Sequence, residues 1–185
     1  VSRSPDDSVG IASLSKIMVG FVALKYIALN EMIETQKGEP YRFSDLLAAM
    51  MISSSNDAAE SVAEEVGERL GGRTQNEKLQ LFIQLMNQEA EALGMRGTYF
   101  TNPTGLDVRP GVPGNRSTAR DLMRLISSTR AVPILWDLSR QDVYTVRSTT
   151  GHMYELINTN TLSSHISQFI GGKTGSTPGS GESLV

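Results

Sequence analysis

The segment from Ser13 to Asn30 places the strongest constraint on the fold, because its only charged residues are Lys16 and Lys25. At about 100° per residue, these two lysines lie on opposite sides of a helix. A helix that is apolar almost all round is expected at the centre of a folded chain. Lys25 can extend its ammonium group to solvent near the helix end. Lys16 cannot do so if its face points inward, which makes it the unusual residue.

The composition is that of a soluble globular protein, since 39% of the 185 residues are apolar and 20% are charged. A chain of this length can build one sizeable core. The net charge of −3 and the lack of a basic block argue against nucleic acid as the main partner. The absence of cysteine excludes disulfides and thiolate metal sites. His152 and His165 have no ligand-like neighbours in the sequence, so we expect no metal and no cofactor.

The first three quarters of the chain are expected to be mostly helical, because apolar residues recur with helical spacing between capping and stop signals. After a first helix at 13–30, helices are expected at 44–52, at about 57–70 behind a cap at Asn56 or Asp57, at 76–93, from a cap at Ser117 or Thr118 to 129, and after Pro133. Residues 1–10 resemble a loop or a frayed end. Residues 96–116 form a long loop, and loops of that length inside a compact domain are usually functional.

The periodicity changes near residue 141. Residues 143–146 and 153–156 flank Gly151 and predict a hairpin. A strand containing a glycine pair is expected over 168–174, and residues 182–185 resemble the beginning of another strand.

Ser13 and Lys16 form a Ser-x-x-Lys motif at the start of the apolar segment. Three residues apart on a helix, the two side chains share one face. A serine hydroxyl is a weak nucleophile near neutral pH, but a neighbouring amine can take its proton if burial or positive charge keeps that amine partly neutral. The helix N-terminus adds backbone N–H groups near a forming oxyanion. Alone, such a motif is more often a helix cap beside a surface lysine.

Ser54 and Asn56 lie on the predicted turn between two helices, where their polar groups can point into a cleft. Ser54 can relay a proton between a lysine and a leaving group. Asn56 can hold a substrate amide or keep Lys16 in place. Serine and asparagine are also the expected residues between helices, so this motif is weak on its own.

Lys173, Thr174 and Gly175 fall in a predicted strand. The lysine supplies positive charge, the threonine can bind a carboxylate or carbonyl, and the glycine lets a substrate backbone lie close to the strand. The alternative interpretation is an exposed edge strand protected by a lysine. The order of all three motifs favours a serine nucleophile activated by lysine, and hence an acyl-transfer enzyme.

Five segments resemble the serine-type D-alanyl-D-alanine carboxypeptidases, the low-molecular-mass penicillin-binding proteins. They are ASLSKIM at 12–18, SSNDAA at 54–59, NPTGLD at 102–107, STARDL at 117–122 and GGKTG at 171–175. The family usually has glycine where the second motif has Ser55. The resemblance covers the chain from Ile11 onward.

The resemblance implies a peptidoglycan enzyme. Ser13 would attack the penultimate D-Ala carbonyl of a stem peptide ending in D-Ala-D-Ala and release the terminal D-Ala, and water would hydrolyse the acyl-enzyme. Lys16 would be the general base, and Ser54, Asn56 and Lys173 would complete the proton and electrostatic network. A β-lactam would acylate Ser13 by the same route and act as an inhibitor.

The resemblance also implies a substrate-binding set. The two backbone N–H groups of the family's oxyanion hole map to Ser13 and Ser176. Thr174 would help to bind the substrate carboxylate, and Gly175 would allow close approach of the substrate. The expected location is extracytoplasmic, in the periplasm or on the outer face of the bacterial cytoplasmic membrane, with any anchor in a segment absent here.

The implied fold is α+β and β-lactamase/transpeptidase-like, in one domain over 1–185. A mostly helical lobe is expected at about 11–140 and a strand-rich part at about 141–185. Family members have strands before the nucleophile helix and further strands after the Lys-Thr-Gly strand, so the chain is expected to be shortened at both ends. Its antiparallel sheet would then be incomplete and would be completed by missing segments or another chain, because unpaired strand edges tend to associate.

Three alternatives stay open: a D,D-endopeptidase, a β-lactamase of the same fold, and a catalytically inactive peptidoglycan-binding module. A common serine β-lactamase needs a loop glutamate, and no Glu-x-x-Leu-Asn segment lies between the second and third motifs. The inactive module is suggested by the incomplete sheet, which can leave Thr174 and Ser176 misplaced.

Overall fold

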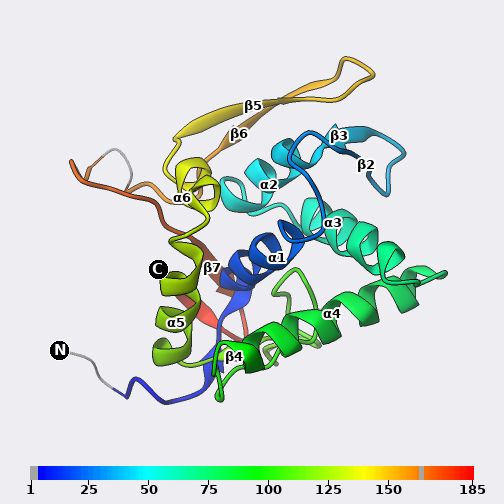
Figure 1. The fold of residues 1–185 in the computed structure, drawn as a ribbon. Helices are drawn as coiled ribbons and strands as arrows, with labels where there is room; N and C mark the ends of the chain where they lie inside the picture. Colours follow the sequence, from blue (N-terminus) through cyan, green and yellow to red (C-terminus); the bar gives the residue numbers. More distant parts are fainter. Residues whose placement is uncertain (1–3, 163–164) are drawn as a thin grey trace.

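The structure is a computed structural model that describes residues 4–162 and 165–185 (Figure 1). The described helices are η1 (Ala12–Leu14), α1 (Ser15–Ala23), α2 (Phe43–Met51), α3 (Asn56–Arg69), α4 (Gln75–Ala92), α5 (Ala119–Thr129) and α6 (Pro133–Ser139). The described strands are β1 (Val9–Gly10), β2 (Met32–Glu34), β3 (Pro40–Arg42), β4 (Arg116–Ser117), β5 (Val143–Arg147), β6 (Met153–Ile157), β7 (Thr174–Thr177) and β8 (Gly181–Leu184). They pair antiparallel as β1–β4, β2–β3, β5–β6 and β7–β8, so the α+β prediction is confirmed.

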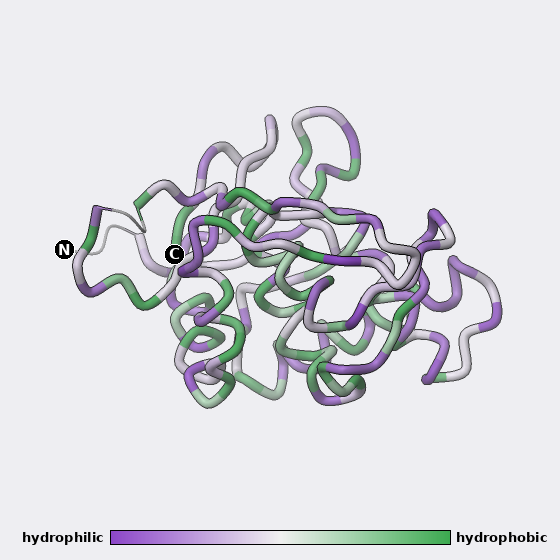
Figure 2. The backbone as a smooth tube through the Cα atoms, turned by 90° about the horizontal axis from the view of Figure 1, so that it is seen from above, coloured by the Kyte–Doolittle hydropathy of each residue, from purple (hydrophilic) through white to green (hydrophobic). Residues whose placement is uncertain are grey.

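Helix α1 lies at the centre of the helical part, with α2, α3, α4 and α6 around it (Figure 1). All of its residues except Phe21 are buried, as its apolar sequence predicts. A Cβ atom on Gly20 would lie 2.7 Å from Leu135 and 3.0 Å from Leu47, so the glycine allows α2 and α6 to approach. Hydrophobic stretches recur along the helices in Figure 2, whereas the outer loops carry many of the hydrophilic ones.

The expected first helix is too long, because α1 ends at Ala23 instead of residue 30. Tight backbone turns follow, in which the Lys25 N–H donates to Val22 O and the Tyr26 N–H to Ala23 O. The Lys25 ammonium reaches Glu89 of α4 at 2.6 Å, and its side chain is 46% exposed. Its expected outward extension is therefore confirmed, and its ion pair with α4 fixes the chain where the helix ends.

The start of α3 departs from the expected cap. Ser55 caps it by accepting a hydrogen bond from the Ala58 N–H at 3.2 Å, where Asn56 or Asp57 was expected. The reason is competition for the Asn56 side chain, whose Oδ1 atom accepts a hydrogen bond from Lys16. The expected cap of α5 at Thr118 is confirmed, with a 3.1 Å hydrogen bond from the Asp121 N–H.

Two short pairings were not expected. Strand β1 pairs with β4, so residues 9–10 belong to a sheet and not to a frayed end. Strands β2 and β3 form a three-residue pairing in which Ile33 and Tyr41 are the buried pair. Each of these strands offers too few alternating residues for the pattern to be recognised.

The strand-rich part agrees with the sequence at two of three places. Strands β5 and β6 form the expected hairpin around Gly151, and β8 lies close to the predicted position. The strand expected at 168–174 is wrong before residue 174, where β7 begins. A Cβ atom on Gly171 (φ +135°) would lie 2.5 Å from Ser139 Oγ, and this close packing against α6 interrupts the extended chain. The division into two lobes of one domain stays a prediction.

Candidate active site

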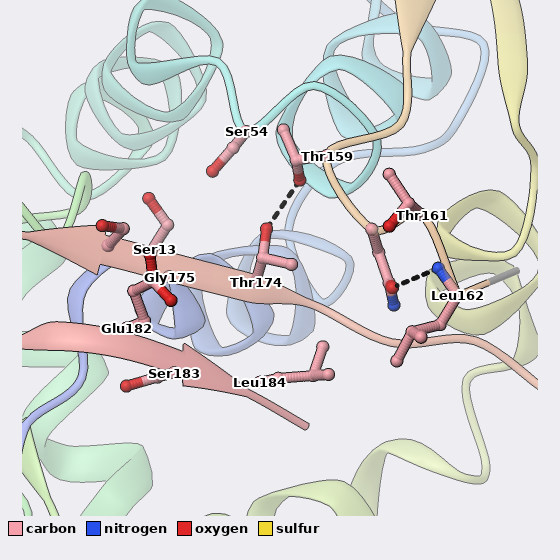
Figure 3. Close-up of a pocket in the computed structure, with 12 residues that line it drawn as sticks. Ser13, Ser54, Thr159, Thr161, Leu162, Thr174, Gly175, Glu182, Ser183 and Leu184 are labelled. Carbon is pink, nitrogen blue, oxygen red and sulfur yellow. Dashed lines mark hydrogen bonds between the residues drawn. The ribbon is translucent and has the colours of Figure 1, made fainter.

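The hydroxyl of Ser13 lies in η1 at the mouth of a groove, immediately before α1 (Figure 3). The preceding residue, Ala12, has φ +44°, a left-handed conformation that is costly for a residue with a side chain. The Ser15 hydroxyl donates to Ala12 O at 2.7 Å and accepts from the fully buried Asn115 at 2.7 Å. The unusual backbone that presents Ser13 is therefore fixed by buried hydrogen bonds.

Lys16 is fully buried, with none of its surface exposed. Its Nζ atom lies 2.9 Å from Ser13 Oγ, 2.9 Å from Asn56 Oδ1 and 2.6 Å from Thr104 O. Burial, and after it the positive charge of Lys173, lower the pKa of this amine from 10.5 to about 7. The structure thus brings Ser13, Lys16 and Asn56 together, as the sequence predicts.

Ser54 lies on the turn between α2 and α3 and has φ +60°. This left-handed conformation is strained for serine and turns Ser54 toward the groove, which it lines opposite Ser13 (Figure 3). The Lys173 ammonium donates to Ser54 Oγ and to Thr174 O, both at 2.9 Å. Lys173 is 1% exposed, and burial lowers its pKa from 10.5 to about 8. The second and third motifs therefore meet through this lysine.

The backbone carbonyl of Thr104 is the functional contact that sequence reasoning missed. Asn102 Oδ1 shapes this part of the loop by accepting from the Gly105 N–H at 2.7 Å and from Thr104 Oγ1 at 3.0 Å. Gly105 has φ +86°, and a Cβ atom there would lie 2.0 Å from Ala12 O. The only available signal was the Asn-Pro-Thr-Gly sequence in a long loop, which does not show which backbone atom points inward.

Asp107 ties the same loop to the third motif. Its carboxylate accepts from Thr177 Oγ1 at 2.6 Å and from the Gly179 N–H at 2.9 Å, across the turn that joins β7 to β8. The loop at 96–116 thus contacts η1, Lys16 and the β7–β8 turn, which agrees with a functional role.

Strand β7 forms the other wall of the groove, which has a volume of about 610 Å³. A Cβ atom on Gly175 would lie 3.1 Å from Ser13 N, so the glycine allows β7 to run beside the nucleophile. Thr174, Gly175 and Ser176 all line the groove, as expected. Figure 3 shows the first two on strand β7. The backbone N–H groups of Ser13 and Ser176 belong to these two adjacent segments, and their role as an oxyanion hole stays a prediction.

This arrangement agrees with the comparison with known families. Residues 28–185 match the model of the D-alanyl-D-alanine carboxypeptidase family. The chain belongs to this family. The resemblance drawn from the five motifs is therefore confirmed, and so is the transpeptidase-like fold that it implies.

Individual members of the D-alanyl-D-alanine carboxypeptidase family give the extent of the match. A D-alanyl-D-alanine endopeptidase of Pseudomonas aeruginosa is 33% identical over 207 residues, which cover 100% of this chain and 61% of that relative. A D-alanyl-D-alanine endopeptidase of Escherichia coli is 34% identical over 179 residues, which cover 87% of this chain and 53% of that relative. The crystal structure of a Mycobacterium tuberculosis D-alanyl-D-alanine carboxypeptidase superposes with a TM-score of 0.83 at 28% identity, and the match covers 100% of this chain and 70% of that one. The chain thus spans a little more than half the length of these curated relatives.

Two further properties concern only the part of the chain that the structure describes. Within 4–162 and 165–185, three or more histidine, cysteine or acidic side chains do not gather as a metal site would require. Over the same ranges, none of the helices has the length and apolarity needed to cross a membrane.

Proposed function

We propose that this chain carries the catalytic centre of a serine D,D-carboxypeptidase, which removes the terminal D-Ala from peptidoglycan stem peptides through an acyl-enzyme on Ser13. The observation that carries the proposal is the environment of Lys16 Nζ. Two of its three partners, Asn56 Oδ1 and Thr104 O, can only accept hydrogen bonds. A neutral amine satisfies both with its two N–H groups and directs its lone pair at the third partner, the Ser13 hydroxyl.

The acylation step follows from this geometry. Lys16 Nζ takes the Ser13 hydroxyl proton as Oγ forms a bond to the penultimate D-Ala carbonyl carbon. The backbone N–H groups of Ser13 and Ser176 stabilise the oxyanion. The proton then passes to the leaving nitrogen as the C–N bond breaks, and Ser54 is the relay because it lines the same groove. Water next cleaves the ester and restores the Ser13 hydroxyl.

Lys173 and β7 hold the substrate in the proposed reaction. The buried Lys173 ammonium orients Ser54 and places positive charge behind Thr174, whose hydroxyl binds the substrate carboxylate. Gly175 leaves room for the peptide backbone. A β-lactam, which presents a strained amide and a carboxylate, would acylate Ser13 in the same orientation and leave it slowly.

Labelling with a fluorescent penicillin tests the nucleophile. The folded wild-type chain should form a covalent adduct, and Ser13→Ala should form none. Ser53→Ala is the matched control, because the Ser53 hydroxyl donates to Ala49 O and lies outside the groove lining. Labelling of Ser13→Ala at the wild-type rate would refute the proposal, and ligand binding without D-Ala release would favour the inactive peptidoglycan-binding module.

A D,D-endopeptidase is the second candidate, because two of the relatives that match this chain are named D-alanyl-D-alanine endopeptidases. Mass spectrometry of the products distinguishes the two activities. A carboxypeptidase releases D-Ala from an uncross-linked pentapeptide, whereas an endopeptidase splits a cross-linked dimer into monomers. Faster cleavage of the dimer would replace the first proposal with the second.

An extracytoplasmic location accompanies the proposed function, because peptidoglycan lies outside the cytoplasm. A membrane anchor, which the family resemblance allows but does not specify, stays a prediction. Completion of the sheet beside β8 by another segment or chain also stays a prediction, as do peptidoglycan and β-lactams as partners.

A further inference from the structure

Thr159, which follows β6, contacts the third motif, although sequence reasoning did not select it. Its Oγ1 atom lies 2.6 Å from Thr174 Oγ1, and either atom can be the donor. Both residues line the groove, where Figure 3 shows their hydroxyls pointing toward each other. Thr174 therefore does not act as an isolated hydroxyl.

The backbone around Thr159 is held in place. Its N–H donates to Ile52 O at 3.0 Å, which ties it to the end of α2 just before the turn that carries Ser54. The neighbouring Asn158 is buried and donates to Ser139 O at 2.8 Å and to Gln141 O at 2.7 Å. Thr159 is thus fixed relative to both the second motif and the third.

The two hydroxyls have a defined direction once an anion is bound. A carboxylate only accepts hydrogen bonds, so the Thr174 hydroxyl must donate its proton to it. Thr174 Oγ1 is then free to accept. The Thr159 hydroxyl, whose other acceptor is Ile52 O at the longer distance of 3.4 Å, becomes its donor at 2.6 Å. Donation into Thr174 Oγ1 strengthens the hydrogen bond that Thr174 gives, because chains of hydrogen bonds polarise one another.

The charges at the groove make this pair important. Among the described residues that line it, Glu182 is the only charged one, and a carboxylate in the ligand would be repelled by it. Lys173 is 1% exposed and donates to Ser54 Oγ and Thr174 O, so it acts through its field and not by direct contact. Hydroxyl groups and the Asn160 amide are therefore the side-chain donors that line the groove, and among them the Thr159 and Thr174 pair is the one on the third motif.

We infer that Thr159 is a positioning residue, which orients the Thr174 hydroxyl and makes it a stronger donor to the terminal carboxylate of a D-Ala-D-Ala ligand. The inference rests on the proposed function for the identity of the ligand. It adds the chain that follows β6 to the three motifs and the loop at 96–116 that build the site.

Binding without turnover tests this inference separately from the reaction. In the Ser13→Ala background, calorimetric titration would compare an N-acetylated peptide ending in D-Ala-D-Ala with the same peptide carrying a C-terminal amide. Adding Thr159→Val should weaken binding of the acid about threefold to tenfold, the effect of one hydrogen bond, and change binding of the amide much less. Thr159→Ser should restore binding of the acid. Thr145→Val, which removes an exposed hydroxyl on β5 outside the groove lining, is the matched control.

The outcomes separate the two proposals. Equal loss of acid and amide binding in Thr159→Val, or no loss at all, would overturn the positioning role, as would a Thr159→Ser variant as defective as Thr159→Val. If the selectivity for the acid falls as expected but the wild-type chain forms no penicillin adduct, the inference holds and the catalytic proposal fails. In an active chain, Thr159→Val should raise KM for the acid with little change in kcat.

Discussion

The buried amine of Lys16 should make the stability of the protein depend on pH in a way that one substitution removes. The pKa of this amine is about 7 in the folded chain, against an ordinary value of 10.5. Between these values the unfolded chain binds a proton that the folded chain does not, so the free energy of unfolding rises with pH. Lys173, with a pKa of about 8, contributes in the same direction at somewhat higher pH.

The magnitude follows from the two pKa values. Integrating proton binding from pH 7 to pH 9 gives about 2 kcal/mol from Lys16 and about 1 kcal/mol from Lys173. The wild-type chain should therefore gain about 3 kcal/mol of unfolding free energy over this range. Lys16→Met keeps the apolar length of the side chain and removes the titrating group, so the gain should fall to about 1 kcal/mol.

Urea unfolding at several pH values between 7 and 9 measures this effect, with circular dichroism as the readout. Lys25→Met, which removes a half-exposed lysine near the end of α1, controls for the loss of a lysine. A wild-type stability that does not change between pH 7 and pH 9 would show that Lys16 is not held neutral. The same conclusion follows if the unfolding free energy of Lys16→Met rises with pH as steeply as that of the wild-type chain. The general base would then have to be a group other than Lys16.

Two further predictions concern rate and backbone conformation. The second-order rate constant for acylation by a penicillin should show a bell-shaped dependence on pH. It should fall below about pH 7, where Lys16 gains a proton, and above about pH 8, where Lys173 loses one. Stopped-flow labelling measures both changes, and a rate constant that does not vary from pH 5 to pH 9 would contradict the assignment of the base. Gly105→Ala should lower the unfolding free energy by about 3 kcal/mol or more, since its Cβ atom would collide with Ala12 O in addition to the cost of the left-handed backbone. Gly111→Ala, with φ +75° and open space around its Cβ position, should cost only about 1 kcal/mol, and equal losses in the two variants would refute the collision.

The sequence predicts those parts of the site that depend on local spacing. Ser13 and Lys16 are three residues apart, and the start of a helix is enough to bring them together. The contact of Lys173 with Ser54 spans 119 positions, and spacing alone could not predict it. That both residues belong to one network was expected only because the three motifs resemble a known family.

Two contacts of the site, made by the Thr104 carbonyl and the Thr159 hydroxyl, could not be predicted from the sequence. The carbonyl of Thr104 is chemically the same as any other carbonyl, and only the fold of the loop directs it at Lys16. Thr159 carries an ordinary hydroxyl, and its role depends on the backbone bond to Ile52 that places it beside Thr174. Both contacts need the three-dimensional arrangement, which local patterns do not contain.

The misplaced cap of α3 shows how a site overrides local preference. Asparagine is among the best helix-capping residues, so Asn56 was a reasonable cap. In the structure its side-chain oxygen accepts from Lys16, and Ser55 caps the helix instead. Most family members have glycine where this chain has Ser55, and glycine has no side chain that could accept this hydrogen bond. We therefore expect the hydrogen bond from the Ala58 N–H to Ser55 Oγ to stabilise α3 in this chain in a way that glycine could not.

The apolar character of α1 is also a requirement of the proposed chemistry. An exposed lysine keeps a pKa near 10.4 and is almost fully charged at neutral pH, so it cannot take a proton from serine efficiently. Lys16 is partly neutral near pH 7 because it lies in a helix of which all residues except Phe21 are buried. At a pH well below 7, where the amine is charged in the folded and the unfolded chain, this burial lowers the unfolding free energy by about 5 kcal/mol. Full burial of a side chain such as Ile17, Met18 or Val19 contributes about 1.5–3 kcal/mol, so a few of them offset that cost. The same residues that place α1 at the centre of the fold thereby allow its lysine to act as a base.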